Sequence, residues 1–337
     1  MQFQPPLPSQ STPGNAAPLA LVLGATGGIG GEVARQLSAS GWRIRALNRN
    51  AATAQAQAAH PFSWIQGDAM TRSDVVDAAR DASLIVHAVN PPGYQRWSEL
   101  VLPMLDNAIA AARASGARIV LPGTVYNYGP DAFAHLSEDS PQHPVTRKGA
   151  IRVEMERRLR VAADSGVRSL VVRAGDFFGP QAANNWFSQG LVKPGRAVAS
   201  ISYPGRQGVG HQWSYLPDVA RTMVQLVERE RAQPGTLDAF ASFHTQGHWD
   251  ADGTQMTAAI RRSASAGADV KIRAFPWWLI GLAAPLVPLF REMKEMRYLW
   301  QQPLQMDNRR LLSLLGTEPH TPLDEAVQAT LAGLGCR

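Results

Sequence analysis

A glycine-rich turn between an apolar run and an amphipathic helix constrains the fold of this chain most strongly. Residues 19–23 read LALVL, the pattern of a strand buried on both faces of a parallel sheet. The next eight residues read GATGGIGG, and Ile29, Val33 and Leu37 then recur every four residues, as on one face of a helix that ends at Gly41. These segments predict a strand, a tight turn and a helix.

The same alternation continues through the first half of the chain. Five further strand-like runs occupy residues 43–47, 62–65, 84–89, 118–121 and 167–172. Helical patterns separate several of them, including one with apolar residues from Leu100 to Ala111. Repeated strand–helix units predict an α/β fold of Rossmann type, with a doubly wound parallel sheet.

The alternation stops near Arg173, where loops rich in Gly, Pro, Trp and Gln begin. We expect a flexible tail over residues 1–18, a dinucleotide-binding domain over 19–180 and a smaller substrate lobe over 181–337. A helical segment at about 213–232 is expected to return to the core. Such a lobe would cover the carboxyl edge of the sheet, where open α/β sheets bind their ligands.

The glycine spacing predicts a dinucleotide site. Glycines allow a tight turn and a close approach to a pyrophosphate, which the amides of the helix N-terminus then bind. The spacing G-x-x-G-x-x-G is one residue longer than the usual fingerprint, and such a turn can also be purely structural. Six residues of the turn are expected to contact the cofactor: Gly24, Thr26, Gly27, Gly28, Ile29 and Gly30.

The segment after the second predicted strand favours NADP(H) over NAD(H). An NAD site usually has an acidic residue about twenty positions beyond the glycines, which binds the ribose 2′-hydroxyl. No Asp or Glu occurs between Glu32 and Asp68, and Arg49 stands at this place instead. Its guanidinium could bind a 2′-phosphate, although an ordinary solvent-exposed arginine is the alternative interpretation.

Several motifs resemble the extended and atypical short-chain dehydrogenase/reductases, close to the NAD-dependent epimerase/dehydratase group. In chain order they are GATGGIG at 24–30, GD at 67–68, VY at 125–126, RAGDFFGP at 173–180 and WSYLPDVA at 213–220. The resemblance covers roughly residues 19–230. It implies that Asp68 contacts adenine, that residues 87–90 line the adenosine and ribose side, and that Arg173 and the residues after it lie beside the nicotinamide. Within the 87–90 segment, the expected contacts are Ala88 and Asn90.

The catalytic pair of that family is missing. The family uses a tyrosine followed four residues later by a lysine, which lowers the tyrosine pKa. None of the six tyrosines here is followed by a lysine at that spacing. Thr124 resembles the family's Ser/Thr position. Counted from it, the position of the catalytic tyrosine falls near Lys148, and the position of the catalytic lysine falls near Arg152.

Lys148 is therefore the candidate proton-transfer residue. A desolvated pocket beside Arg152 would lower the pKa of Lys148, whereas an arginine holds its own proton too tightly to transfer it. Thr124 would orient the substrate oxygen. Three further residues are expected to line the substrate pocket: Tyr126, His211 and Trp213. The alternative is that Lys148 and Arg152 are exposed helix residues in a protein that binds NADP(H) without catalysis.

Charge and composition narrow the expected partners. The net charge is +6, but the arginines are scattered, and those in residues 152–160 alternate with glutamates as on a solvated helix face. We expect no nucleic-acid partner. The single cysteine, Cys336, and a proline-rich start without an export signal favour a cytoplasmic location.

The longest uncharged apolar segment spans residues 275–290. It is too short, and too broken by prolines, to cross a bilayer. Its two adjacent tryptophans and flanking cations could instead contact a membrane surface, and a packed helix or pocket wall is the alternative.

Other chemistries fit less well. His244 and His248 lie near Asp250 and Asp252, but the stretch resembles a loop, so no metal site is expected. The chain contains no G-x-S-x-G elbow and no phosphate-binding G-x-x-x-x-G-K-[ST] loop.

These observations favour an NADP(H)-dependent oxidoreductase that transfers hydride to or from a small carbonyl or alcohol substrate. A non-catalytic NADP(H) redox sensor is one alternative. A sugar-nucleotide epimerase or dehydratase is another, although the missing tyrosine weighs against it. The resemblance also implies a homodimer packed through helices that include residues 148–160, whose charged side chains could equally face water.

Overall fold

The computed structural model of this chain describes residues 17–91, 97–182, 185–265 and 267–336, so most of the expected tail lies outside it. Its centre is a seven-stranded sheet in the order β11-β7-β5-β4-β1-β2-β3, in which every neighbouring pair is parallel. The strands are β1 (Leu19–Leu23), β2 (Arg43–Asn48), β3 (Ser63–Gln66), β4 (Leu84–His87), β5 (Arg118–Gly123), β7 (Ser169–Arg173) and β11 (Phe240–His244). The predicted Rossmann-type sheet is confirmed.

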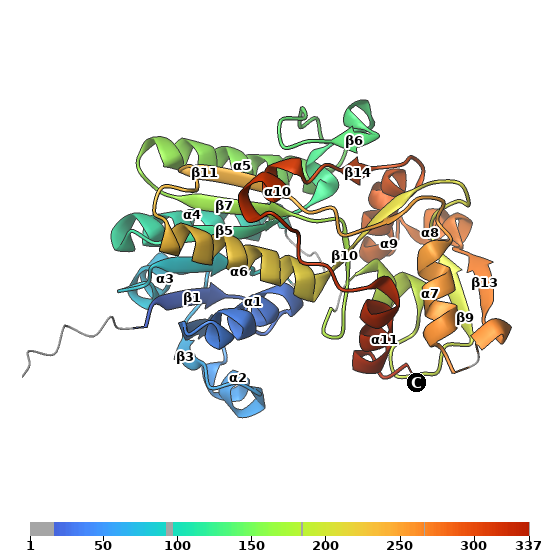
Figure 1. Cartoon of the computed structure of the whole chain (residues 1–337), viewed down its shortest axis with the longest axis horizontal. Coiled ribbons are helices and arrows are strands. Elements are labelled where there is room, and N and C mark those ends of the chain that lie inside the picture. Colours follow the sequence, from blue (N-terminus) through green and yellow to red (C-terminus); the bar gives the residue numbers. More distant parts are fainter. Residues whose placement is uncertain (1–16, 92–96, 183–184, 266, 337) are drawn as a thin grey trace, which may run out of the picture.

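Helices cover both faces of this sheet (Figure 1). They are α1 (Gly28–Ala39), α2 (Ala51–Gln57), α3 (Arg72–Ala78), α4 (Trp97–Ser115), α5 (Arg147–Asp164) and α6 (Leu216–Ala232). Along β1, Ala20 and Val22 pack in the core beneath α1 and α6, whereas Leu19, Leu21 and Leu23 pack beneath α3, α4 and α5. Each buried leucine or valine contributes about 2 kcal/mol, so an uninterrupted apolar run suits a strand covered on both faces.

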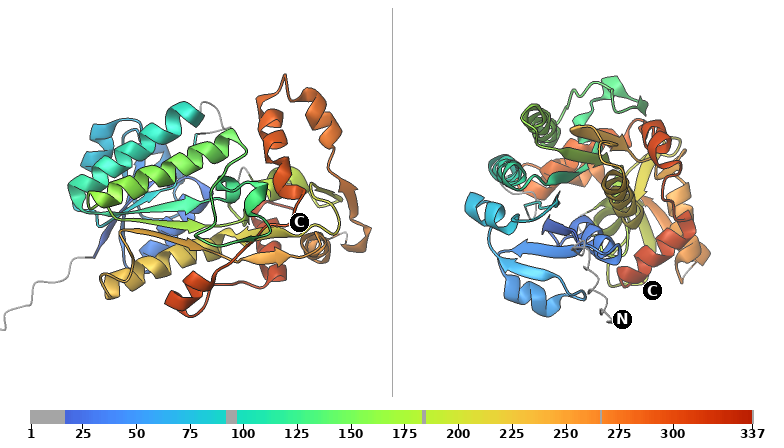
Figure 2. Two further views of the ribbon diagram at one scale, coloured as in Figure 1. Left: turned by 90° about the horizontal axis from the view of Figure 1, so that it is seen from above. Right: turned by 60° about the vertical axis from the view of Figure 1, so that its left-hand side comes forward.

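The remaining chain forms a lobe beside the carboxyl ends of the strands, with its own aromatic core (Figures 1 and 2). Its strands are β6 (His135–Leu136), β8 (Asp176–Phe178), β9 (Ser200–Tyr203), β10 (His211–Tyr215), β12 (His248–Asp250), β13 (Lys271–Ala274) and β14 (Gln305–Met306). Its helices are α7 (Gln255–Ser263), α8 (Trp277–Ala283), α9 (Pro288–Glu295) and α11 (Leu323–Gly333), whereas α10 (Arg309–Leu315) packs against the central sheet. Short helical turns are η2 (Val125–Asn127), η3 (Pro130–Ala132), η4 (Phe187–Leu191), η5 (Gly267–Asp269) and η6 (Met296–Trp300).

Three elements from the second half of the chain join the central layers, α6, β11 and α10, the last through Leu311 in the core of the sheet. The helix α6 packs against α1, and the strand β11 pairs with β7 at the edge of the sheet. Sequence analysis did not predict β11. None of the helices that the structure describes is long and apolar enough to cross a membrane.

The order of the strands reverses between β1 and β4, which are neighbours in the sheet although β2 and β3 separate them in the chain. Such a switch point opens a crevice at the carboxyl ends of the strands. Gly24 follows β1 there with a φ of +96°, and a Cβ atom at this position would lie 2.6 Å from the carbonyl oxygen of Ala88 after β4. Only glycine lets the two strand ends approach this closely.

Candidate active site

A cavity of about 960 Å³ opens at this switch point and extends to the lobe. Its walls come from the glycine turn, the ends of β2, β4 and β5, the first turns of α5, the chain after β7, and α9. The cavity is large enough for a ligand of cofactor size with a second small molecule beside it.

The glycine turn forms one end of the cavity. Five of the six turn residues expected at the cofactor line it: Gly24, Thr26, Gly27, Gly28 and Ile29. The sixth, Gly30, is not among the lining residues, because it packs against the backbone of Gly24 and the side chain of Ala88. Gly27 is the N-cap of α1, and the first turn of this helix carries no acidic residue. The positive end of the helix therefore faces the cavity unneutralised.

Arg49 lines the cavity just beyond β2, between Asn48 and Asn50. Its side chain is exposed, and no carboxylate occurs on this part of the wall before Asp68. The guanidinium of Arg45 donates hydrogen bonds to the carbonyls of residues 78 and 80, at 2.7 and 2.8 Å, and it does not line the cavity. Of the arginines on and beside β2, only Arg49 reaches the wall of the cavity.

The residues expected to bind adenosine also line the cavity. Asp68 holds its loop together, since its Oδ1 accepts from the backbone amide of Met70 at 2.9 Å. Ala88 and Asn90 follow β4 on the opposite wall. His87 ends β4 and is fully buried, and this burial, together with the nearby Arg152, lowers its pKa to about 3. It is therefore neutral at physiological pH.

Lys148 lies in the first turn of α5, which starts at the N-cap Thr146. The Thr146 hydroxyl accepts from the amide of Gly149 at 3.0 Å and fixes this turn. Lys148 is only 5% exposed, and its Nζ lies 2.9 Å from Oε2 of Glu292 on α9. Burial lowers the pKa of Lys148, Glu292 opposes this shift, and Arg152 adds to it. Lys148 is thus not the exposed helix residue of the alternative interpretation.

Thr124, Tyr126 and Arg152 line the cavity beside Lys148. Thr124 caps the short helix η2, and its Oγ1 accepts from the amide of Tyr126 at 3.4 Å. Arg152 lies one turn along α5 with its guanidinium carbon 5.1 Å from the ring centroid of Trp97. The three residues assigned to catalysis from the sequence therefore lie on one wall.

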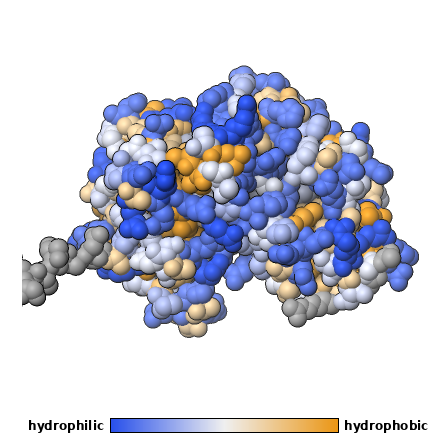
Figure 3. Space-filling view, viewed as in Figure 1, coloured by the Kyte–Doolittle hydropathy of each residue, from blue (hydrophilic) through white to orange (hydrophobic). Residues whose placement is uncertain are grey.

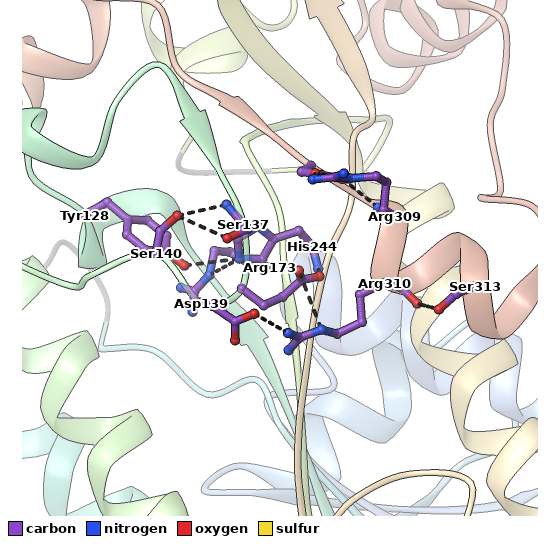
Figure 4. Close-up of polar contacts among 11 residues, drawn as sticks. Tyr128, Ser137, Asp139, Ser140, Arg173, His244, Arg309, Arg310 and Ser313 are labelled. Atoms are coloured by element: carbon purple, nitrogen blue, oxygen red, sulfur yellow. Dashed lines mark hydrogen bonds and ion pairs between the residues drawn. The ribbon is translucent and has the colours of Figure 1, made fainter.

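Arg173 lies behind the cavity wall, not in it. It is 1% exposed, and its Nη2 donates to both carboxylate oxygens of Glu156, at 2.7 and 2.9 Å. Its Nη1 donates to the carbonyl of Thr124 at 2.5 Å. Its Nε lies 3.2 Å from Nε2 of His244, beside which it is drawn in Figure 4. Residues 174–177, directly after it, line the cavity. Arg173 thus holds the segment expected beside the nicotinamide in place, but its own side chain does not line the cavity.

His211 and Trp213 also lie behind the wall, because β10 is covered by β8, β12 and the aromatic core of the lobe. The ring of His211 stacks on Trp300 with centroids 3.7 Å apart, and its Nε2 lies 2.9 Å from Oδ2 of Asp176. Asp176 does line the cavity. Neither His211 nor Trp213 is among the lining residues, so the structure corrects their expected direct contact with substrate.

Three of the four residues weighed for a metal site belong to strands, and the fourth, Asp252, lies in the bend after β12. His244 ends β11, and β12 begins at His248. The hydroxyl of Tyr128 lies 3.1 Å from Nε2 of His244, which also faces Arg173. Within the described ranges, no three His, Cys, Asp or Glu side chains come together to hold a metal ion.

Residues 20–238 match the sequence profile of the NAD dependent epimerase/dehydratase family. The chain belongs to this family. Uncharacterized protein y4nL of Sinorhizobium fredii is 26% identical over an alignment of 237 residues, and the match covers 64% of this chain and 65% of that protein. The chain therefore matches slightly less than two thirds of that relative's length.

Solved structures of the same fold include sugar-nucleotide epimerases. UDP-glucose 4-epimerase from Brucella ovis in complex with NAD has a TM-score of 0.71 and 15% identity, over 95% of this chain and 99% of that one. A putative epimerase from Burkholderia cenocepacia has a TM-score of 0.69 and 18% identity, over 96% and 100%. The Bordetella bronchiseptica enzyme WbmH in complex with NAD⁺ has a TM-score of 0.67 and 18% identity, over 94% and 98%. Together with the family, these complexes support a nicotinamide dinucleotide as the cofactor.

In this member of the epimerase/dehydratase family, the lobe supplies cavity residues that the sequence did not reveal. Five of them are Trp186, Gln189, Glu292, Met293 and Met296. The last three belong to α9 and η6, beyond the part of the chain that matches the family. An amphipathic pattern in α9 could have indicated a packed helix, but nothing local pairs its Glu292 with Lys148, which lies 144 positions earlier.

Proposed function

We propose that this chain is an NADP(H)-dependent oxidoreductase of the atypical short-chain type, which passes hydride to or from a carbonyl or alcohol carbon of a small molecule. The observation that carries the proposal is the burial of Lys148 in the wall of one cavity that runs from the glycine turn to the lobe. A proton-transfer group at this place suits a reaction between a dinucleotide at one end and a substrate at the other.

The residues at the glycine turn fit a dinucleotide. Gly24 leaves no space for a Cβ atom, and the amides at the start of α1 would bind the pyrophosphate. Arg49, exposed at the end of β2, would bind the 2′-phosphate that distinguishes NADP(H) from NAD(H). Asp68 and Asn90 would contact the adenosine side. The bound nicotinamide would supply or accept the hydride.

The protein's own chemistry would be a proton transfer at Lys148. In the reductive direction, the carbonyl oxygen takes up one proton while its carbon takes up hydride. The Lys148 ammonium would donate this proton from Nζ, and the neutral amine would regain one from solvent. Burial lowers the pKa of Lys148, which brings donation closer to neutral pH. Thr124 would donate a hydrogen bond to the same oxygen, and Arg152, always charged, would bind ribose hydroxyls.

The lobe side of the cavity favours an uncharged substrate over a sugar nucleotide. Among the described residues from 181 onward that line the cavity, Glu292 is the one charged side chain, and it is negative. A nucleoside diphosphate is best recognised by arginine or lysine. The tryptophan, methionine and amide side chains found here suit a compact, neutral carbonyl compound better.

A nucleotide titration tests the cofactor first. Arg49→Ala should lose at least about tenfold in NADPH affinity, as expected for one charge-assisted phosphate contact, while NADH binding stays constant. The matched control is Arg43→Ala, because Arg43 begins the strand that Arg49 follows, but it donates to the carbonyl of Ala17 and does not line the cavity. Failure of the purified protein to bind either nucleotide would refute the proposal.

A turnover screen tests the reaction. With a panel of neutral ketones and aldehydes, Lys148→Met should abolish NADPH consumption while NADPH still binds. Lys193→Met serves as the control, because Lys193 is exposed and lies outside the cavity. Tight NADPH binding without turnover of any substrate would instead support the redox sensor. An inverted sugar nucleotide formed without net loss of NADPH would support an epimerase.

A further inference from the structure

The helical hairpin formed by α8 and α9 carries a concentrated set of exposed apolar side chains. Five of the ten large hydrophobic residues exposed in the described part of the chain fall within the hairpin, residues 277–295, and a sixth, Ile272, lies on the preceding strand β13. Trp278 and Leu282 lie one turn apart on the same side of α8 and are 75 and 72% exposed, and Leu286, in the turn after α8, is 87% exposed. An exposed cluster of this kind marks an interaction surface.

The hairpin is firmly attached through its other side. Ile280 and Ala284 are buried, and Nε1 of Trp277 donates to the carbonyl of Pro204 at 2.8 Å. The ring of Trp277 also packs against Trp186, with centroids 5.8 Å apart. In the left view of Figure 2, the two helices stand out from the rest of the molecule. The hairpin is therefore held against the lobe by its other side.

The surroundings of this apolar side are positively charged. Residues 271–297 contain five lysines and arginines against two glutamates, a formal charge of +3. Of the two glutamates, Glu292 turns inward to Lys148. Lys271, Arg273, Arg291 and Lys294 are all exposed. By contrast, the face drawn in Figure 3 is mainly hydrophilic, with hydrophobic residues in scattered patches.

We propose that the α8–α9 hairpin docks on the anionic surface of a lipid bilayer. Trp278, Leu282 and Leu286 would enter the boundary between headgroups and acyl chains, and the exposed lysines and arginines would meet the anionic headgroups. The positive charge of the hairpin favours an anionic bilayer over a second copy of this chain, because two positively charged hairpins would repel each other. The proposal is independent of the proposed reaction.

Vesicle flotation with the full-length protein tests this docking. The protein should float with vesicles of equal parts phosphatidylcholine and phosphatidylglycerol, and much less with phosphatidylcholine alone. The triple variant Trp278→Ser, Leu282→Ser, Leu286→Ser should bind the anionic vesicles at least about tenfold more weakly. Raising the salt concentration should weaken binding of the unchanged protein, because the headgroup attraction is screened.

The matched control is the double variant Val145→Ser, Val161→Ser, which removes two exposed apolar residues outside the hairpin and should bind like the unchanged protein. NADPH titration of each variant reports whether the cofactor domain is intact. The docking is refuted if the unchanged protein stays with the buffer, or if the triple variant still floats fully. It is also refuted if vesicle binding is absent and the triple variant converts a dimer into a monomer in sedimentation, because the patch is then an interface between copies.

Discussion

The strongest prediction for stability concerns the buried ion pair between Glu156 and Arg173. Replacing Glu156 by Gln keeps the shape of the side chain but leaves the Arg173 guanidinium, which is fully enclosed, without its counter-charge. Glu156 also accepts hydrogen bonds from Asn127 and Gln142, at 2.9 Å each. Removing one partner of a buried pair costs roughly 3–5 kcal/mol, because the remaining charge is uncompensated. We expect this loss in the free energy of unfolding.

Urea denaturation followed by circular dichroism measures the effect. The control is Glu154→Gln on the same helix, because Glu154 pairs with Arg157 and Arg158 near the surface and should contribute no more than about 1 kcal/mol. The double variant Glu156→Gln, Arg173→Met should be less destabilised than the sum of the two single variants. Equal losses for Glu156→Gln and Glu154→Gln would refute the burial of this pair.

Three further predictions follow from the site. Gly24→Ala should weaken NADPH binding in a fluorescence titration at least about tenfold more than Gly41→Ala, because both residues have positive φ but only Gly24 has no room for a Cβ atom. Burial lowers the pKa of His87 from 6.5 to about 3, so between these pH values the unfolded chain binds a proton at this residue and the folded chain does not. The free energy of unfolding should therefore fall as the pH drops from 6.5 to about 3, by up to about 1.4 kcal/mol per pH unit. His87→Gln should flatten this slope in urea titrations at several pH values. Glu292→Gln should move the alkaline limb of the kcat/KM profile to lower pH, because Glu292 stabilises the charged form of Lys148; an unmoved limb would contradict the assigned proton donor.

Local patterns predicted several residues of the glycine turn and of the end of β2 that line the cavity. The glycine turn and Arg49 depend on residues close together in the chain, and the structure places Gly24, Thr26 and Arg49 in one cavity wall. Counting along the sequence from Thr124 also placed Lys148 near the position of the family's catalytic tyrosine. These features needed only a strand, a turn and a helix in the right order.

The side of the cavity that faces the lobe could not be predicted in the same way. Arg173 and His211 belong to motifs that do lie at the site, but the alternation of side chains along a strand decides whether a residue faces the ligand or the core behind it. The strand β11 was missed because its sequence FASFH is short and carries no clear alternation. Glu292 could not be linked to Lys148 by any pattern, since packing of α9 brings them together.

The ion pair between Lys148 and Glu292 couples the protonation state of Lys148 to the position of α9. Glu292 stabilises the charged form of Lys148 only while α9 lies against α5. Loss of the Lys148 proton therefore removes an attraction that holds α9 against α5, and because binding free energies are reciprocal, a displacement of α9 changes the proton affinity of Lys148 in turn. A ligand that binds α9 more tightly in one position than in another would therefore shift the protonation of Lys148.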